Sequence, residues 1–172
     1  DVVLNLVASV AGVGYNTTHQ GSMFRDNMNL AVNMIEAARL ENVERFLVVS
    51  SACVYPRYCE IPTPESEGFR DIPEQTNEGY GWAKRMAEFL GRSYAAEFDM
   101  KVAIVRPYNA YGPRDHFDPD KSHVIAALVR RVCMGENPLL VWGNGRSTRS
   151  FLYVDDFARG LLEVAERYPK AD

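Results

Sequence analysis

Tyr80 and Lys84 are the residues whose types and spacing most directly suggest chemistry. They lie four positions apart, so on a helix they share one face. A phenol has an ordinary pKa of about 10 and is a poor acid or base near neutral pH. A lysine ammonium beside it favours the phenolate and lowers that pKa, so the pair could exchange the proton of an alcohol-to-ketone interconversion. A chance pairing is the alternative, because the chain has nine tyrosines and lysine is common.

A hydroxyl and a thiol stand two residues apart after a predicted strand. Ser51 follows the apolar run at residues 46–49, and its hydroxyl could hydrogen-bond the substrate oxygen that Tyr80 protonates. If the chain stays extended, Cys53 points to the same side, and its thiol could remove a proton from the carbon next to a ketone. The alternatives are a serine that satisfies local backbone groups and a buried apolar thiol.

Histidine and arginine side chains further along could complete a site. His123 opens a predicted helix and could act as an acid opposite a thiolate base, with a structural histidine as the alternative. Arg131 and Arg149 carry the forked guanidinium that suits a diphosphate. Surface pairing with a carboxylate such as Glu136 is the alternative for these arginines, and it is the interpretation that we favour for Arg130.

The elements that must position these side chains alternate between strands and helices. Apolar runs predict strands at residues 1–8, 46–49, 102–105 and 139–142, and helical spacing predicts helices at 23–40, 80–98, 123–134 (with Ser122 as N-cap) and 154–167. Residues 9–21 are predicted to be a loop. Buried strands separated by helices predict an α/β fold with a doubly wound parallel sheet. Ligands bind such sheets beyond the carboxyl ends of the strands, where Ser51 lies.

Composition narrows the class of protein. The chain has 172 residues, 47% apolar and 24% charged, which is typical of a globular domain. A net charge of −4 gives no reason to expect nucleic acid or an anionic membrane as a partner. No apolar run approaches the roughly 20 residues of a membrane span. The three cysteines show no metal-ligand spacing, so we expect no metal and reduced thiols in the cytoplasm.

Together these segments resemble the extended short-chain dehydrogenase/reductase family of nucleotide-sugar epimerases, dehydratases and reductases. Ser51, the Tyr80-x-x-x-Lys84 motif, Arg106-Pro-Tyr-Asn-Ala-Tyr-Gly-Pro113 and Arg149-Ser-Phe-Leu-Tyr-Val-Asp-Asp156 occur in the family's order, and the resemblance covers essentially the whole chain. It implies a Rossmann-like fold in which residues 1–106 are the C-terminal part of the NAD(P)-binding domain. Residues 107–150 would belong to a smaller substrate-binding domain, and residues 151–172 would be a strand and helix that return to the first domain.

The family also has a Gly-x-x-Gly-x-x-Gly turn that holds the cofactor pyrophosphate at a helix N-terminus. The sequence lacks this turn, and it opens inside an apolar strand and stops after a helix, so we expect truncation at both ends. We also expect the 172-residue species by itself to be inactive and to bind the cofactor weakly.

Two segments narrow the resemblance further. Ser51-Ala-Cys-Val-Tyr-Pro56 and Ser122-His-Val-Ile125 resemble the subgroup of 3,5-epimerase/4-reductases that act on GDP-4-keto-6-deoxymannose. His116 and Ala126 stand where that subgroup usually has Asn and Pro, and Ser50-Ser-Ala-Cys53 also resembles GDP-mannose 3,5-epimerases. Another nucleotide-sugar epimerase or dehydratase, and a non-catalytic dinucleotide-binding sensor, are the remaining alternatives.

The resemblance assigns roles to individual positions, with NADP or NAD as the cofactor and a GDP-linked keto-deoxysugar as the substrate. It implies that the catalytic residues are Ser51, Cys53, Tyr80, Lys84 and His123. The implied cofactor-binding residues are Ala8, Ser50, Tyr80, Lys84, Pro107, Asn109, Ala110 and His123, and the implied substrate-binding residues are Val10, Gly12, Asn109, Arg131, Trp142 and Arg149. A homodimer formed through the helices at 23–40 and 80–98 is also implied.

Overall fold

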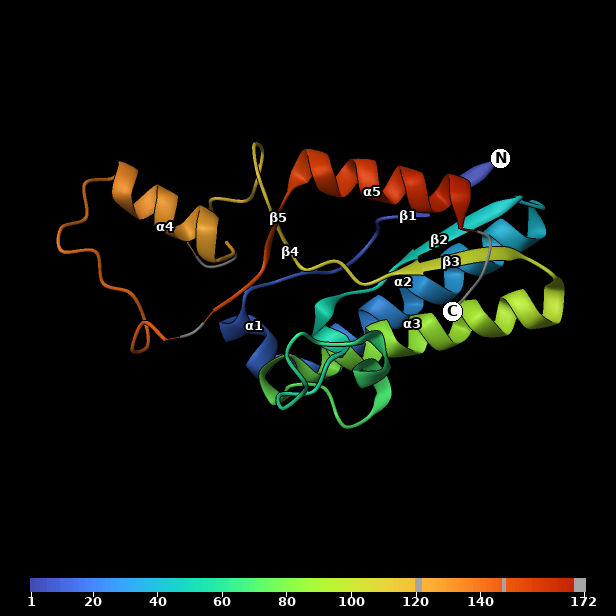
Figure 1. Cartoon of the computed structure of the whole chain (residues 1–172), viewed down its shortest axis with the longest axis horizontal. Coiled ribbons are helices and arrows are strands. Elements are labelled where there is room, and N and C mark those ends of the chain that lie inside the picture. The colour runs from blue at the N-terminus through green and yellow to red at the C-terminus, as the bar shows by residue number, and fades with distance from the viewer. Residues whose placement is uncertain (120–121, 147, 169–172) are drawn as a thin grey trace.

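A parallel sheet of three strands forms the centre of the computed structural model, which describes residues 1–119, 122–146 and 148–168. The strands β1 (Val2–Asn5), β2 (Arg45–Val49) and β3 (Lys101–Val105) lie in the order β1-β2-β3 (Figure 1). Val3 pairs with Phe46, and Phe46 pairs with Val102. The predicted parallel sheet is therefore confirmed, with its carboxyl ends at one edge.

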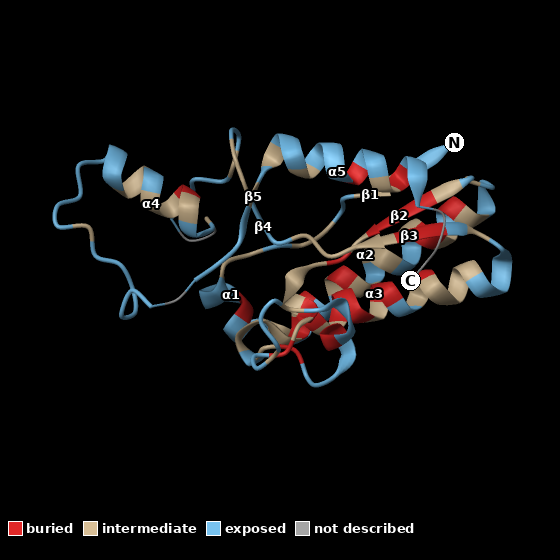
Figure 2. Ribbon diagram, in the orientation of Figure 1, coloured by how far each residue is buried: buried red, intermediate tan, exposed pale blue. Residues whose placement is uncertain are grey.

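Helices cover both faces of this sheet. The helices α2 (Gln20–Leu40) and α3 (Glu78–Phe98) pack on one face, and α5 (Val154–Arg167) packs on the other (Figure 1). The first face buries Ile35, Ala38, Phe46, Val48, Ala87 and Val102, and the second buries Leu47, Ala103, Leu161 and Ala165. Alternate residues of β2 thus point into opposite cores, as strand geometry requires. Figure 2 shows buried residues gathered along β2, β3 and α3, and the doubly wound arrangement is confirmed.

Short helices occupy the segments that were predicted to be irregular. Residues 9–21 were predicted as a loop, but α1 (Val13–Thr18) forms there and α2 begins at Gln20. The long segment between β2 and α3 contains three 3₁₀ helices, η1 (Ala52–Val54), η2 (Glu65–Phe69) and η3 (Gln75–Asn77). The loop prediction for residues 9–21 failed because a helix of six residues leaves too short a hydrophobic pattern to detect.

A second, two-stranded sheet and α4 extend from the main body. The strands β4 (Asn109–Tyr111) and β5 (Phe151–Tyr153) pair in parallel, and α4 (Val124–Cys133) lies at the end of the molecule farthest from the main sheet (Figure 1). The predicted strand at residues 139–142 is wrong, because no neighbouring strand pairs with it among the described residues and Trp142 is 91% exposed. The N-cap of α4 is His123, not the predicted Ser122.

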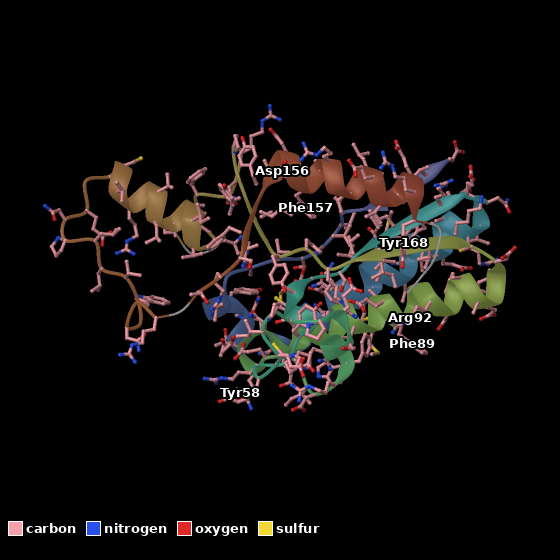
Figure 3. All side chains as sticks on the ribbon, viewed as in Figure 1. Tyr58, Phe89, Arg92, Asp156, Phe157 and Tyr168 are labelled. Carbon is pink, nitrogen blue, oxygen red and sulfur yellow. The ribbon has the colours of Figure 1, made fainter. Side chains whose placement is uncertain are left out.

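After β5 the chain returns to the main sheet through α5, and β5 itself does not pair with that sheet. The strand β5 pairs with β4, whereas Phe157 on α5 packs toward the main sheet (Figure 3). The predicted boundaries at residues 106 and 150 remain predictions.

The first strand is less buried than its sequence predicts. Val2 and the following Leu6 and Val7 are exposed, with Leu6 at 61%. Val2 lies on β1, which is an edge strand of the described sheet and is bonded to β2 on one side, whereas Leu6 and Val7 lie after the end of the strand. In the part of the chain that the structure describes, no helix is both long and apolar enough to cross a lipid bilayer.

Candidate active site

The segments that follow the three main strands meet at the carboxyl edge of the sheet. The backbone N–H of Ser50 donates to the carbonyl of Val105 at 2.8 Å, and that of Ala52 donates to the carbonyl of Pro107 at 3.0 Å. After β1, Asn27 of α2 binds both the N–H and the carbonyl of Ser9 at 3.0 Å, which fixes the loop next to Ala8. Three residues predicted to bind the cofactor, Ala8, Ser50 and Pro107, therefore lie at this edge.

Ser51 lies between the thiol and the phenol. Its side-chain oxygen accepts a hydrogen bond from the backbone N–H of Cys53 at 3.1 Å, which caps η1. Side-chain hydrogen bonding to Ser51 lowers the pKa of both Cys53 and Tyr80. The structure thus brings together three predicted catalytic residues that come from two different elements.

Lys84 joins this cluster from α3. Its side chain is buried, Nζ donates to the carbonyl of Val49 at 2.8 Å, and Nζ lies 5.5 Å from the centre of the Tyr80 ring. Burial lowers the pKa of Lys84 to about 8, while the nearby Cys53 raises it. The ammonium is therefore the main form of Lys84 at neutral pH, because its pKa of about 8 still lies above that pH.

Tyr80 departs from the prediction. Burial raises the pKa of Tyr80 above its ordinary value, the charge of Cys53 raises it further, and Ser51 lowers it. The expected lowering by Lys84 is wrong, because burial is the largest cause of the shift and Lys84 is not among the groups that lower the pKa of Tyr80. Tyr80 is thus a firmly protonated phenol, which suits an acid that delivers a proton to a forming alcohol.

The thiol of Cys53 is also held in its protonated form. Burial raises its pKa, the carboxylate of Glu74 adds to this, and Ser51 and Lys84 act in the opposite direction. Cys53 can therefore donate a proton in this state, whereas action as a base requires the thiolate that Ser51 and Lys84 favour.

His123 belongs to the second part of the chain and lies next to the loop that follows β1. It is exposed at the N-cap of α4, and a Cβ atom built on Gly12 would lie 3.6 Å from the carbonyl oxygen of the preceding Ser122. The loop that contains Val10 and Gly12 therefore lies against the segment that carries the imidazole. Val10 and Gly12 were both predicted to bind the substrate.

The other predicted substrate residues are not gathered around Ser51. Arg131 binds Glu136 and donates to the carbonyl of Leu140 at 2.6 Å, so the surface pairing considered as the alternative is what forms. Trp142 is exposed, and Figure 1 shows α4 and the segment after it far from the main sheet. Arg149 is exposed and donates to the carbonyl of Thr148.

Two further predicted positions lie on β4. The side chain of Asn109 donates to the carbonyl of Ser150 at 3.2 Å, which ties β4 to the chain that enters β5, and Ala110 is exposed.

A buried charged network next to the site was not predicted. Glu88 of α3 is fully buried, accepts two hydrogen bonds from Arg106 at 2.8 and 2.7 Å, and accepts a third from the hydroxyl of Ser50 at 2.5 Å. A glutamate on a helix normally faces solvent, so the residue type did not predict that Glu88 would be buried. The available signal was its spacing, four residues after Lys84 and on the same face. Because the Ser50 hydroxyl is bonded to Glu88, a cofactor contact at Ser50 would use its backbone.

The described residues offer no group of three or more His, Cys, Asp or Glu side chains placed to hold a metal ion. The predicted catalytic side chains that the structure gathers at this edge supply a phenol, a thiol, a hydroxyl and an ammonium.

Comparison with known proteins agrees with this arrangement. GDP-L-fucose synthase of Escherichia coli (strain K12) is 37% identical over 170 residues, which are 96% of this chain and 53% of that protein. GDP-mannose 3,5-epimerase 1 of Oryza sativa subsp. indica is 31% identical over 167 residues, 96% of this chain and 44% of that protein. The solved GDP-L-fucose synthetase from Naegleria fowleri bound to NADP has a TM-score of 0.82 and 30% identity, covering 99% of this chain and 57% of that one.

The chain thus spans about half the length of the curated relatives that it matches. The sequence pattern of one family matches along residues 1–172. By this match, and by the parallel sheet whose carboxyl edge carries Ser51, Tyr80 and Lys84, the chain belongs to the NAD-dependent epimerase/dehydratase family.

Proposed function

We propose that the whole protein epimerises and reduces a GDP-linked 4-keto-6-deoxysugar with NADPH, the reaction of a GDP-L-fucose synthase. The observation that carries this proposal is the clustering of Ser51, Cys53, Tyr80 and Lys84 at the carboxyl edge of the sheet. A reductase needs the hydroxyl, the phenol and the ammonium. The thiol adds an acid-base group that reduction alone does not need.

The donors at this edge fit a dinucleotide. An ammonium has three N–H groups, and the carbonyl of Val49 takes one, so among the described contacts Lys84 keeps donors for the hydroxyls of a ribose. The N. fowleri relative was solved with NADP, which supports NADP over NAD. When bound, NADPH supplies the hydride for the reduction. The residues proposed to hold it are Ala8, Ser50, Tyr80, Lys84, Pro107, Asn109, Ala110 and His123.

The protein's own side chains would handle the carbonyl and the protons. Ser51 and Tyr80 would hydrogen-bond the ketone oxygen at carbon 4, which acidifies the protons at carbons 3 and 5. Cys53 and His123 would exchange those protons from opposite faces of the sugar, and Tyr80 would protonate the oxygen at carbon 4. Because the pKa of Tyr80 is raised, the phenol carries at neutral pH the proton that it would deliver, and the acceptor is the more basic alkoxide that forms at carbon 4.

A GDP-mannose 3,5-epimerase is the second candidate, because such an enzyme is 31% identical to this chain. It would use the same thiol without net reduction, so consumption of NADPH separates the two. A non-catalytic sensor is less well supported, since it has no need of the hydroxyl, phenol and ammonium together.

The test uses the whole protein with GDP-4-keto-6-deoxymannose and NADPH in deuterated water. We expect NADPH oxidation and deuterium at carbons 3 and 5 of the product. In Cys53→Ser, reduction should survive while deuterium incorporation falls about 100-fold, the scale of one acid-base group. Cys133→Ser, which changes an exposed thiol on α4, is the matched control. Undiminished incorporation in Cys53→Ser would remove Cys53 from the mechanism.

We also propose a homodimer in the cytoplasm. The helices α2 and α3 present exposed Phe24, Val32 and Phe89 beside an open apolar groove that Trp82 and Met86 line. Such a face suits packing against a second copy. The three cysteines are free thiols, which suits a reducing compartment.

A further inference from the structure

Arg85 is a buried arginine that holds a backbone carbonyl beside the site. It follows Lys84 on α3 and is 1% exposed. Its Nε and Nη2 atoms both donate to the carbonyl oxygen of Val54, at 2.9 and 2.6 Å. Val54 is fully buried and ends η1, the short helix that contains Cys53. Two N–H groups from one rigid fork therefore fix the residue next to the thiol.

The surroundings of Arg85 indicate a geometric role. Its guanidinium lies 4.9 Å from the centre of the Trp82 ring and 5.6 Å from that of Phe69. Burial lowers the pKa of Arg85, and none of the ion pairs among the described residues includes it. It is also absent from the groups that shift the pKa of Cys53. A buried guanidinium that directs two N–H groups at one backbone carbonyl acts on this segment through position.

Three consecutive attachments join α3 to the segment that carries the thiol. Lys84 binds the carbonyl of Val49, Glu88 binds the hydroxyl of Ser50, and Arg85 binds the carbonyl of Val54. The first two hold the start of the segment and Arg85 holds its end. Ser51 and Cys53 lie between these attachments, and Tyr80 lies on the same helix. Arg85 therefore makes the last of the three attachments that set the distance from the Cys53 thiol to the Tyr80 phenol.

We propose that Arg85 is a positioning residue that holds the Cys53 thiol in register with the Tyr80 phenol. It thereby sets how much proton exchange beside the ketone accompanies reduction at carbon 4. The second statement rests on the proposed function, whereas the reactivity of the Cys53 thiol can be measured without any sugar.

The first test compares Arg85→Met with Arg92→Met in the whole protein. Arg92 lies two turns further along α3, 4.9 Å from the Phe69 ring centre and 3.9 Å from Glu88, so it matches Arg85 in helix and aromatic contact. In Arg85→Met, the ratio of deuterium incorporation to NADPH oxidation should fall about tenfold or more, because small misplacements of reacting groups cost this much. Arg92→Met should keep the ratio. General destabilisation lowers both rates together and leaves the ratio unchanged.

The second test follows the pH dependence of iodoacetamide alkylation at Cys53, with Cys133 as an internal reference. Release of η1 in Arg85→Met should move the Cys53 profile, because burial, Ser51 and Lys84 all act on this thiol. Arg92→Met should leave the profile in place. This measurement judges Arg85 even if the whole protein fails to turn over the GDP-sugar, an outcome that would count against the proposed function alone.

Arg85→Lys completes the series. A lysine keeps the charge but lacks the planar guanidinium that donates two N–H groups to one carbonyl. The deuterium ratio and the Cys53 alkylation profile of Arg85→Lys should therefore lie between those of the parent protein and Arg85→Met. If Arg85→Met fails to fold, Arg85→Lys is judged by the same two measurements. A folded Arg85 variant with an unchanged ratio and an unchanged Cys53 profile would overturn the proposal.

Discussion

Burial decides which side chains of the site carry protons. Tyr80 and Cys53 both have a raised pKa, chiefly from burial, whereas burial lowers the pKa of Lys84 to about 8. At neutral pH the phenol and the thiol are therefore protonated, and Lys84 alone is charged among these three. In this state Tyr80 carries a proton that it could donate, and Cys53 must lose its proton before it can act as a base.

Glu74 gives a direct test of the electrostatics at Cys53. Its charge adds to the effect of burial on the thiol, so Glu74→Gln should lower the pKa of Cys53 and speed its alkylation at a given pH. Gln keeps an oxygen for the backbone N–H of Thr76, which Glu74 caps at 3.0 Å. Glu78→Gln is the matched control, because Glu78 bonds to Trp82 and does not act on Cys53. Equal profiles for Glu74→Gln and the parent protein would show that Glu74 does not act on the thiol.

The buried charge of Lys84 should lower the free energy of unfolding at neutral pH. Its folded pKa lies below its unfolded value, so the unfolded chain binds more protons between about pH 8 and 10.5, and the stability contributed by Lys84 rises with pH there. Lys84→Met should therefore raise the free energy of unfolding by roughly 1–2 kcal/mol at pH 7. Relief of about 3 kcal/mol of burial exceeds the loss of one charged hydrogen bond.

Urea unfolding of the whole protein at several pH values measures this difference. It should shrink from pH 7 to pH 10, as Lys84 of the parent protein loses its proton. Lys101→Met, at an exposed position paired with Glu44, should show no comparable gain. A gain in Lys84→Met that does not depend on pH would contradict the argument.

At the scale of elements, the sequence predicts what periodicity controls. The helix at 154–167 has the bounds expected from its pattern, and the strands at 46–49 and 102–105 each begin one residue earlier than expected. The apolar run at 139–142 forms no strand, because a strand needs a neighbouring backbone that hydrophobicity does not reveal. The strand β4 was missed because it has three residues between Pro107 and Gly112.

The same reasoning explains which parts of the site were predictable. Ser51 and Cys53 follow a strand and Tyr80 and Lys84 share a helical face, so simple geometry brings them together. The direction of the Tyr80 pKa and the burial of Arg85 and Glu88 depend on how the segment after β2 folds over α3. That segment has no periodic pattern.

Close packing of α3 against the Cys53 segment predicts the effect of a single methyl group. A Cβ atom on Gly81 would lie 2.5 Å from the carbonyl oxygen of Cys53. Gly81→Ala should therefore destabilise the fold by about 1–3 kcal/mol despite the better helix propensity of alanine. Gly160→Ala on α5 meets no atom within 4 Å and should instead stabilise by roughly 0.5–1 kcal/mol. Urea unfolding of both variants measures the contrast, and a stabilised Gly81→Ala would refute the close approach.

The whole molecule offers one outer face suited to a second copy. Phe89 is 59% exposed on the side of α3 that faces away from the sheet (Figure 3). If α2 and α3 form the dimer, Phe89→Asp should dissociate it, because a buried carboxylate without a partner is costly. Sedimentation velocity of the whole protein measures the change, with Leu162→Asp on α5 as the control on the opposite face. A dimer that survives Phe89→Asp would place the contact elsewhere.

The attachments of α3 also limit how the length of this chain can change. Each residue turns a helix by about 100°, so one residue inserted after Lys84 would swing Arg85 and Glu88 away from the segment that they hold. Tyr80 and Lys84 would keep their spacing, yet the thiol would lose its support. Insertions and deletions should therefore be tolerated in the mostly exposed stretch at residues 57–62. They should be rejected between residues 80 and 88, where the length of α3 fixes the spacing of its attachments.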